Sequence, residues 1–287
     1  MRLGYRPPLA GAAMLARLRA AAVPGLERGA PGGTVHSRVV MAPGGPALAT
    51  IDLGADDGWV ALTLRPADPR DVAHAVLAVR SWLDLDADPG PADRALAADP
   101  LLAPLVRARP GLRLPGSPDG FESLALAVLS AGRPPDAARE AAGRLVAAYG
   151  RPAAEGLSGF PDPAELADAD RARLADAVGI DPGRAAALRD LAAAVAAGLD
   201  VSRRAAPART RRRLGRIAGL DAWAIDIWAL RSGGDRDAFV PDDPVLWRAM
   251  GVDDAAGARA RAETWRPWRA HAAAHLWAEA QKPAGLG

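Results

Sequence analysis

The chain has 287 residues, of which 50% are hydrophobic, a formal net charge of +2, and no cysteine. This length suits one large domain or two to three small ones, and the hydrophobic share supports a packed core rather than global disorder. The lack of cysteine excludes disulfides, iron–sulfur clusters and zinc–thiolate sites. The start lacks the apolar run of a signal peptide, and the apolar stretches are too short to span a bilayer. We therefore expect a cytoplasmic protein without a membrane partner.

The positive charge comes almost entirely from arginine, because Lys282 is the only lysine. Such a bias can reflect genomic base composition, as can the abundance of alanine, glycine and proline, so charge alone does not identify a nucleic-acid partner. A mechanism that needs a lysine Schiff base has no candidate before residue 282.

The N-terminal part predicts a small antiparallel sheet backed by helices. Short, partly β-branched runs separated by turn signals predict strands, and apolar residues at helical spacing predict the helices. The expected strands are 34–42, 47–53 and 59–64, and the expected helices are 9–23 and 68–85. Two Pro-Gly signals within residues 108–116 mark a boundary, which gives an α+β domain over 1–112.

From residue 121 onward the pattern is helical, with no convincing strand, which predicts an all-α domain over 113–287. Pro267 interrupts what would otherwise be one helix near the C-terminus. The expected helices are 120–130, 136–149, 163–167, 170–178, 183–198, 209–217, 222–230, 245–250, 255–264 and 267–280.

Residues Ile217–Asp221, with the sequence IAGLD, form a hairpin between two of these helices. Gly219 permits a tight turn, whose backbone N–H groups and following helix N-terminus can bind a phosphate. A glycine turn between helices is, on its own, more often purely structural.

Asp242 and Asp243 directly precede Pro244. An Asp followed by Pro is a favoured helix cap and first helical residue. A capping carboxylate can also be catalytic, since the helix dipole favours its charge and its orientation is restrained. The two roles are compatible.

Taken together, these features are more specific than any one of them. The hairpin is followed by a tryptophan four residues after the glycine, and about twenty residues later by the Asp-Asp-Pro helix start and WRPWRAHAAAHLW. Upstream lie ARPGLRLPGSPDGFESLALAVLSAG, YRPPLAG and LDLDADP. This order resembles a divergent member of the AlkA-like, 3-methyladenine DNA glycosylase II family of helix-hairpin-helix DNA glycosylases. The resemblance implies an N-terminal TATA-binding-protein-like sheet and a glycosylase core in two helical subdomains.

The resemblance implies that Asp243 faces a nucleotide flipped out of the DNA stack. Cleavage of an N-glycosidic bond builds positive charge on the sugar, and a carboxylate there stabilises it or activates water. Trp223 and Trp277 match pocket tryptophans, which attract cationic alkylated bases by cation–π interaction. Bifunctional relatives have a lysine at the position of Trp223, so the resemblance implies a monofunctional enzyme with no cofactor and no metal.

Several positions depart from the family pattern. Ile227 and Pro244 occupy pocket positions that often hold tyrosine, and Asp221 replaces the second glycine of the hairpin. Where the family carries a wedge that fills the gap left by the base, this chain has Gly132 and Arg133; the arginine could probe the minor groove instead. The implied DNA-binding residues are Gly132, Arg133, Gly219, Leu220, Asp221 and Ala222.

Other charged residues allow more than one interpretation. Seven arginines within 203–216 could contact phosphates, or could form a solvated helix face and linker. His271 and His275, one helical turn apart, are expected to be packing residues rather than metal ligands.

The sequence thus predicts a monomeric glycosylase that excises alkylated purines from double-stranded DNA in base-excision repair, associated with the nucleoid when bound. The alternatives are a non-catalytic DNA-binding descendant, a glycosylase adapted to another lesion, and a protein-interaction scaffold.

Overall fold

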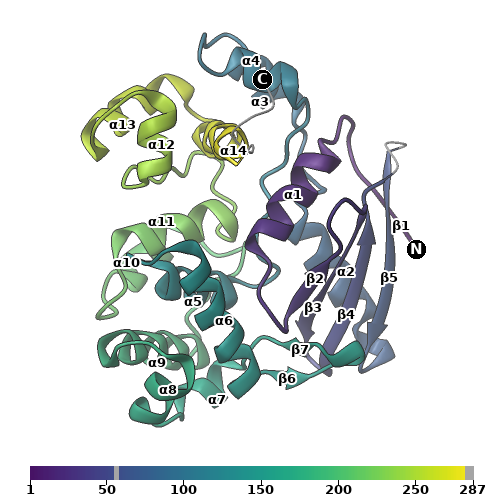
Figure 1. Ribbon diagram of the computed structural model, residues 1–287, viewed down its shortest axis with the longest axis vertical. Coiled ribbons are helices and arrows are strands. Elements are labelled where there is room, and N and C mark those ends of the chain that lie inside the picture. The colour runs from purple at the N-terminus through teal and green to yellow at the C-terminus, as the bar shows by residue number, and fades with distance from the viewer. Residues whose placement is uncertain (55–57, 282–287) are drawn as a thin grey trace.

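The computed structural model describes residues 1–54 and 58–281, so Lys282 lies outside the described part. The N-terminal sheet has five antiparallel strands in the order β1-β5-β4-β3-β2 (Figure 1). Its strands are β1 (Arg2–Gly4), β2 (Glu27–Gly29), β3 (Val35–Ala42), β4 (Gly45–Asp52) and β5 (Trp59–Pro66). The three expected strands are confirmed. The edge strands β1 and β2 were not expected, because three residues are too few to show an alternating pattern.

Two helices, α1 (Gly11–Ala21) and α2 (Val72–Trp82), cover one face of this sheet, and the helix over Pro69–Asp71 precedes α2. Alternate residues of β4, such as Ala49 and Ile51, pack there against Met14, Val79 and Trp82. Leu48 points to the other face and joins the core of the helical part of the chain. Both faces of the central strands are therefore buried, as the period of two in a strand allows.

The expectation that the chain has no strand after residue 121 is wrong. A short hairpin pairs β6 (Arg151–Pro152) with β7 (Ser158–Gly159), around a turn of helix over Ala154–Gly156. It packs on β3 and β4, where Gly159 lies so close to Met41 that a Cβ would fall 2.2 Å from the sulfur. Two-residue strands carry no periodicity, so packing against the sheet decides their conformation.

The rest of the chain is helical, as expected. All ten expected helices are present, and each starts within two residues of its predicted start: α5 (Gly120–Ser130), α6 (Pro135–Tyr149), α7 (Pro163–Ala167), α8 (Arg171–Val178), α9 (Pro182–Ala196), α10 (Pro207–Leu214), α11 (Ala222–Arg231), α12 (Pro244–Met250), α13 (Ala255–Ala262) and α14 (Arg269–Ala280). One turn of helix over Glu263–Trp265 follows α13. Many of these starts are encoded locally, because an aspartate side chain accepts a hydrogen bond from a backbone N–H of the first turn. Such aspartates are Asp119, Asp162, Asp170, Asp181, Asp221, Asp243 and Asp254.

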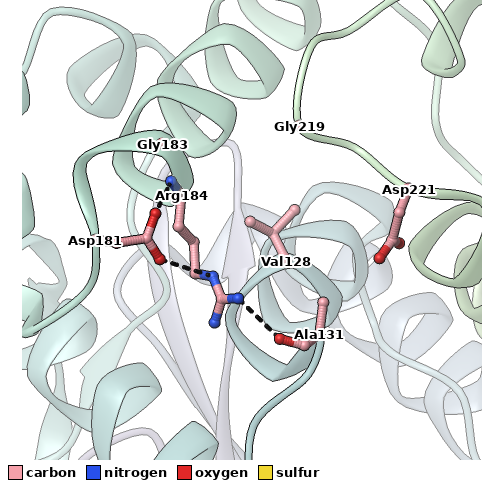
Figure 2. A pocket seen from close by; sticks show the side chains of 7 residues that line it. All are labelled: Val128, Ala131, Asp181, Gly183, Arg184, Gly219 and Asp221. Carbon is pink, nitrogen blue, oxygen red and sulfur yellow. Dashed lines mark hydrogen bonds and ion pairs between the residues drawn. The ribbon is translucent and has the colours of Figure 1, made fainter.

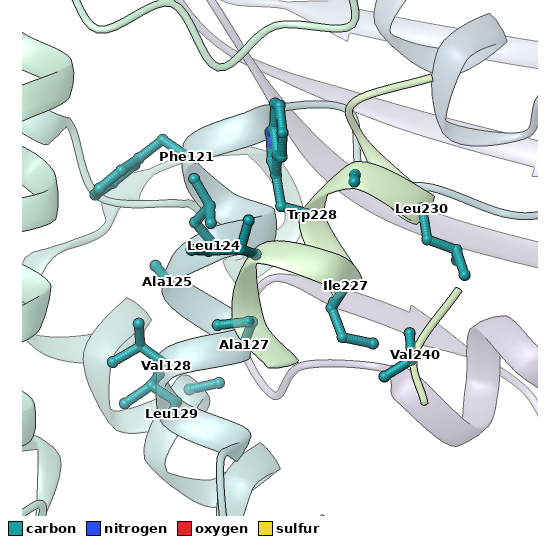
Figure 3. Packing of buried hydrophobic residues seen from close by; sticks show 14 of the residues in the cluster. Phe121, Leu124, Ala125, Ala127, Val128, Leu129, Ile227, Trp228, Leu230 and Val240 are labelled. Carbon is teal, nitrogen blue, oxygen red and sulfur yellow. The ribbon is translucent and has the colours of Figure 1, made fainter. Parts of the chain in front are cut away.

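The helical core centres on the packing of α5 against α11 (Figure 3). Phe121, Leu124 and Val128 of α5 are buried in the same cluster as Ile227 and Trp228 of α11. The indole N–H of Trp228 donates to the carbonyl of Val201 at 2.9 Å, which satisfies its one polar atom. In Figure 1, α11 lies between a lower group, α5 to α10, and an upper group, α12 to α14.

Two short helices that sequence periodicity did not reveal, α3 (Gly90–Leu96) and α4 (Ala103–Ala108), lie beside α14 (Figure 1). Asp99 between them accepts hydrogen bonds from Arg261 and from the indole N–H of Trp265. Arg109 pairs with Glu279 at 2.6 Å. The segment just before the predicted boundary at residue 112 therefore packs on the C-terminal helices. Within residues 1–54 and 58–281, no helix has the length and apolar character needed to cross a membrane.

Candidate active site and DNA-facing surface

Asp243 is held at the N-terminus of α12 by two hydrogen bonds. Its Oδ1 accepts from the backbone N–H of Val245 at 2.7 Å, and its Oδ2 accepts from the indole N–H of Trp277 at 2.8 Å. Trp277 lies on α14 and is only 7% exposed, whereas Asp243 is half-buried. A local helix cap and a contact between distant elements together orient this carboxylate.

The other predicted pocket residues lie in different environments. Trp223 is half-buried in the first turn of α11 and packs on the main core. Ile227 is 6% exposed and belongs to the core between α5 and α11 (Figure 3). Pro244 is the exposed first residue of α12. The structure thus brings Asp243 and Trp277 into contact, and the pocket roles of Trp223, Ile227 and Pro244 stay predictions.

Two arginines that the sequence did not single out lie beside Asp243. Arg17 comes from α1, which runs between the sheet and the helices α11 and α14 (Figure 1), and its guanidinium carbon lies 5.3 Å from the ring centroid of Trp277. Arg231 is the last residue of α11, and its buried Nε–H donates no hydrogen bond within the described residues.

Both guanidinium groups interact electrostatically with Asp243. Burial and the like charge of Arg231 lower the pKa of Arg17 to about 9, while Asp243 opposes this shift. Burial also lowers the pKa of Arg231, and Asp243 again opposes it. The carboxylate of Asp243 therefore interacts with two guanidinium groups and one indole.

A local signal for Arg17 exists, but it is weak. The residue lies at the edge of the apolar face that Met14, Leu15 and Leu18 form on α1. A long side chain can extend its charge away from such a position. The sequence alone does not predict that the guanidinium group of Arg17 contacts Trp277 of α14. Arg231 carries no specific signal, because arginine is common in the last turn of a helix.

The hairpin and the loop after α5 surround one cavity of about 230 Å³. Figure 2 shows Gly219 and Asp221 on one side and Asp181, Gly183 and Arg184 of the α9 start on the other, with Val128 and Ala131 between them. Arg184 donates to the carbonyl of Ala131 at 2.8 Å. Gly219 has a φ of +78°, and a Cβ there would lie 2.9 Å from that of Ala187. The turn and its close approach to α9 both require glycine.

Other predicted DNA-binding residues of the hairpin already have intramolecular contacts. Asp221 caps α11 by accepting from the N–H of Ala224 at 2.8 Å, so its carboxylate occupies the end of the helix where an anion would bind. Leu220 is buried, and its N–H donates to the carbonyl of Ile217. Ala222 is exposed at the first position of α11.

In the loop after α5, Gly132 is exposed, with a φ of +63°, and Arg133 is half-buried. The basic stretch divides into two groups. Arg203 pairs with Asp84, and Arg211 pairs with Asp226 and Asp235. Within the described residues, five others are exposed and form no ion pair or hydrogen bond through their side chains: Arg204, Arg209, Arg212, Arg213 and Arg216.

His271 and His275 are both buried on α14, in agreement with their expected packing role. The pKa of His271 is lowered to about 4, mainly by burial and in part by the charges of Arg236 and His275. Among residues 1–54 and 58–281, no cluster of three or more His, Cys, Asp or Glu side chains has the arrangement of a metal site.

Comparisons with known proteins place these features in a family. The AlkA N-terminal domain family matches residues 1–119. DNA-3-methyladenine glycosylase 2 of Escherichia coli (strain K12) is 32% identical over 283 residues, which cover 96% of this chain and 95% of that protein. The probable bifunctional transcriptional activator/DNA repair enzyme AlkA from two strains of Mycobacterium tuberculosis is 34% identical over 306 residues. That alignment covers 99% of this chain but 57% of those relatives, so the chain spans little more than half their length.

A solved structure shows the same fold over nearly the full length. The 3-methyladenine DNA-glycosylase from Archaeoglobus fulgidus superposes with a TM-score of 0.85, at 16% identity, over 98% of each chain. The near full-length similarity to the Escherichia coli protein is high enough to show common descent. The chain therefore belongs to the AlkA family of DNA glycosylases.

Proposed function

We propose that this protein is a monofunctional DNA glycosylase of base-excision repair, which hydrolyses the N-glycosidic bond of a damaged purine flipped out of double-stranded DNA. The observation that carries the proposal is the double support of Asp243, by the first turn of α12 and by the Trp277 indole. A carboxylate held by two donors loses little conformational entropy when the transition state forms. Such pre-organised groups stabilise developing charge most effectively.

The chemistry follows from the charge that develops in the reaction. As the bond between C1′ and the base breaks, positive charge builds on the sugar, and an adjacent carboxylate stabilises it. Each oxygen of Asp243 accepts one hydrogen bond and has further acceptor capacity. The same group can therefore accept a proton from the water that attacks C1′.

The proposal specifies hydrolysis rather than strand cleavage through a covalent intermediate. A lyase step requires an amine that attacks the sugar. The first turn of α11 carries Trp223 at the relevant position, and the only lysine of the chain is Lys282, five residues beyond Trp277.

DNA binding is proposed from the distribution of charge. The five unpaired arginines of residues 204–216 lie on and around α10, directly before the hairpin. A cluster of exposed guanidinium groups beside a glycine turn suits contacts with consecutive backbone phosphates. We propose that a monomer makes these contacts.

The substrate class is proposed from the relatives. Two of the compared proteins are named for 3-methyladenine, and in this chain Trp277 of α14 contacts the candidate catalytic residue Asp243. Alkylated purines are therefore the first substrates to test. The basic side chains of Arg17 and Arg231 favour a second candidate, a glycosylase adapted to another purine lesion.

The decisive experiment compares Asp243→Asn with Asp242→Asn on duplexes that carry 3-methyladenine, 7-methylguanine or hypoxanthine. We expect Asp243→Asn to lower single-turnover base release by about 10²–10⁴-fold, because this range is typical for the loss of a general acid or base. Duplex affinity should be unchanged.

Asp242 is the matched control, because it is exposed and directly precedes Asp243. Asp242→Asn should release base at the wild-type rate. Equal activity of Asp243→Asn and the wild type would assign catalysis to another residue. Salt-dependent duplex binding without base release from any lesion would instead indicate a DNA-binding descendant that has lost catalysis.

A further inference from the structure

The indole face of Trp277 is partly covered by a cation that belongs to the protein. The guanidinium carbon of Arg17 lies 5.3 Å from the ring centroid of Trp277, within the range of a cation–π interaction. The same indole donates its N–H to Asp243. Arg17 forms no hydrogen bond within the described residues, so its N–H groups are available to a ligand.

This arrangement disfavours a cationic base. A base that carries a permanent positive charge would compete with Arg17 for the electron-rich ring, and would also approach Arg231, whose guanidinium group interacts with the same carboxylate. Two cations and one carboxylate leave the site with a positive balance. Like charges brought together away from water repel strongly.

The same arrangement favours the excision of a neutral base. When a neutral purine leaves, the electron pair of the C1′–N9 bond stays on the ring, which becomes an anion. A nearby guanidinium stabilises that charge, and does so more in the transition state than in the ground state. Its planar N–H groups also match the O6 and N7 acceptors of a purine.

We propose that Arg17 makes this site selective for neutral purine lesions with acceptor atoms, such as hypoxanthine, over cationic N-alkylpurines. The inference rests on the proposed glycosylase function and narrows its substrate class. Arg17 is then a specificity-determining residue, supplied by the N-terminal α+β part of the chain to a site built by α11, α12 and α14.

The reaction balances without any further reagent. The C1′–N9 bond breaks with both electrons going to the purine, and water adds its oxygen to C1′. The proton lost by that water passes to Asp243. Asp243 then releases it and the purine anion beside Arg17 takes up one proton, so the carboxylate is regenerated. The products are the free neutral base and an abasic site.

Undamaged guanine carries the same O6 and N7 acceptors, so contacts with Arg17 cannot exclude it from the site. A different energetic contribution must do so. That contribution is the free energy needed to flip the base out of the duplex, which is lower for a mispaired base than for one in a Watson–Crick pair. Hypoxanthine opposite thymine is such a mispair. The site therefore needs no contact that separates hypoxanthine from guanine.

The test measures single-turnover release of hypoxanthine opposite thymine and of 7-methylguanine opposite cytosine by the wild type, Arg17→Met and Arg17→Lys. We expect the wild type to accelerate hypoxanthine loss over the spontaneous reaction by a larger factor than 7-methylguanine loss. Arg17→Met should reduce hypoxanthine release by about 10²-fold, the effect typical of one lost charge-stabilising donor. It should leave 7-methylguanine release unchanged or raise it severalfold. Arg17→Lys keeps the charge and should restore part of the hypoxanthine activity.

Arg107→Met is the control for removal of one exposed arginine, and thermal melting shows whether each variant folds. Equal losses on both substrates would assign Arg17 a purely structural role, and equal gains would show that it only blocks the pocket; either result overturns the proposal. Release of 7-methylguanine but not hypoxanthine by the wild type would overturn it while leaving the proposed function intact. Release of neither base, nor of 3-methyladenine, would overturn both.

Discussion

At the scale of single residues, Asp243 accepts two hydrogen bonds, one from its own helix and one from a distant helix. Its Oδ1 caps α12 as any Asp before Pro would, and its Oδ2 accepts from the Trp277 indole. The helix cap depends only on adjacent residues and can therefore be predicted from the sequence. The indole contact joins residues on two helices, and local spacing does not encode it.

Asp221 also caps a helix with its carboxylate, but this carboxylate lies where DNA is expected to bind. Its carboxylate accepts from the N–H of Ala224 and so lies at the hairpin, where a phosphate would otherwise approach the N-terminus of α11. The cap stabilises the helix at the expense of anion binding.

We therefore expect Asp221→Asn to bind duplex DNA more tightly. Asparagine caps a helix about as well as aspartate, so stability should hardly change. Removal of one negative charge about 4 Å from a phosphate in water corresponds to about 1 kcal/mol, or about fivefold in affinity. Fluorescence anisotropy at low salt with a duplex containing an abasic-site analogue measures the change. Asp254→Asn, at the cap of α13, is the control and should have no effect; an equal gain there would refute a local role for Asp221.

At the scale of secondary-structure elements, one buried ion pair links the sheet to the helical core, beside the apolar packing of Val39 and Leu48. Arg38 of β3 donates through Nη2 to both carboxylate oxygens of Glu122 in α5, at 2.7 and 2.8 Å. The Ser117 hydroxyl donates to the same carboxylate at 2.8 Å. Arg38 and Glu122 are 3% and 4% exposed, so each depends on the other for charge compensation.

Glu122→Gln should destabilise the fold strongly, because the buried guanidinium of Arg38 loses the carboxylate to which it donates its hydrogen bonds. Breaking one side of such a pair costs about 3–5 kcal/mol. Urea unfolding of Glu122→Gln, Arg38→Met and the double variant measures the coupling. We expect the double variant to lose much less than the sum of the two single changes. Additive losses would show that the two side chains do not depend on each other.

At the scale of the whole molecule, a formal net charge of +2 conceals an uneven distribution. Arg17, Arg38, Arg203 and Arg211 interact with tryptophan rings or acidic side chains. The other five arginines of residues 204–216 are exposed and unpaired within the described residues. Only the second group is free to replace counterions on DNA.

Replacement of Arg212 and Arg213 by glutamine should weaken the salt dependence of duplex binding. If each contacts one phosphate, the slope of log Kobs against log salt should become less steep by about 1.8, since each contact contributes about 0.9. Titrations at several salt concentrations give the slope. The control replaces Arg94 and Arg107, which are exposed on α3 and α4, well separated from α10 in Figure 1. A change of slope in the control alone would place the DNA on another face.

The sequence by itself determined the fold class, the ten helices after residue 119 and the helix cap at Asp243. These features depend on neighbouring residues: apolar periodicity, aspartates before first turns, and prolines. The order of its motifs also led to the family. The hairpin β6–β7, the short helices α3 and α4 and the edge strands were not predicted, because such short segments take their conformation from the surfaces that they pack on.

Only the tertiary structure decided the composition of the candidate site. It brings Arg17 of α1 onto Trp277 of α14, and places Arg231 beside Asp243. The physical reason is that a contact between side chains from distant elements depends on how whole helices pack, which no local spacing records. The sequence predicted the carboxylate, and the contact of Arg17 with Trp277 supplied the positive charge beside it.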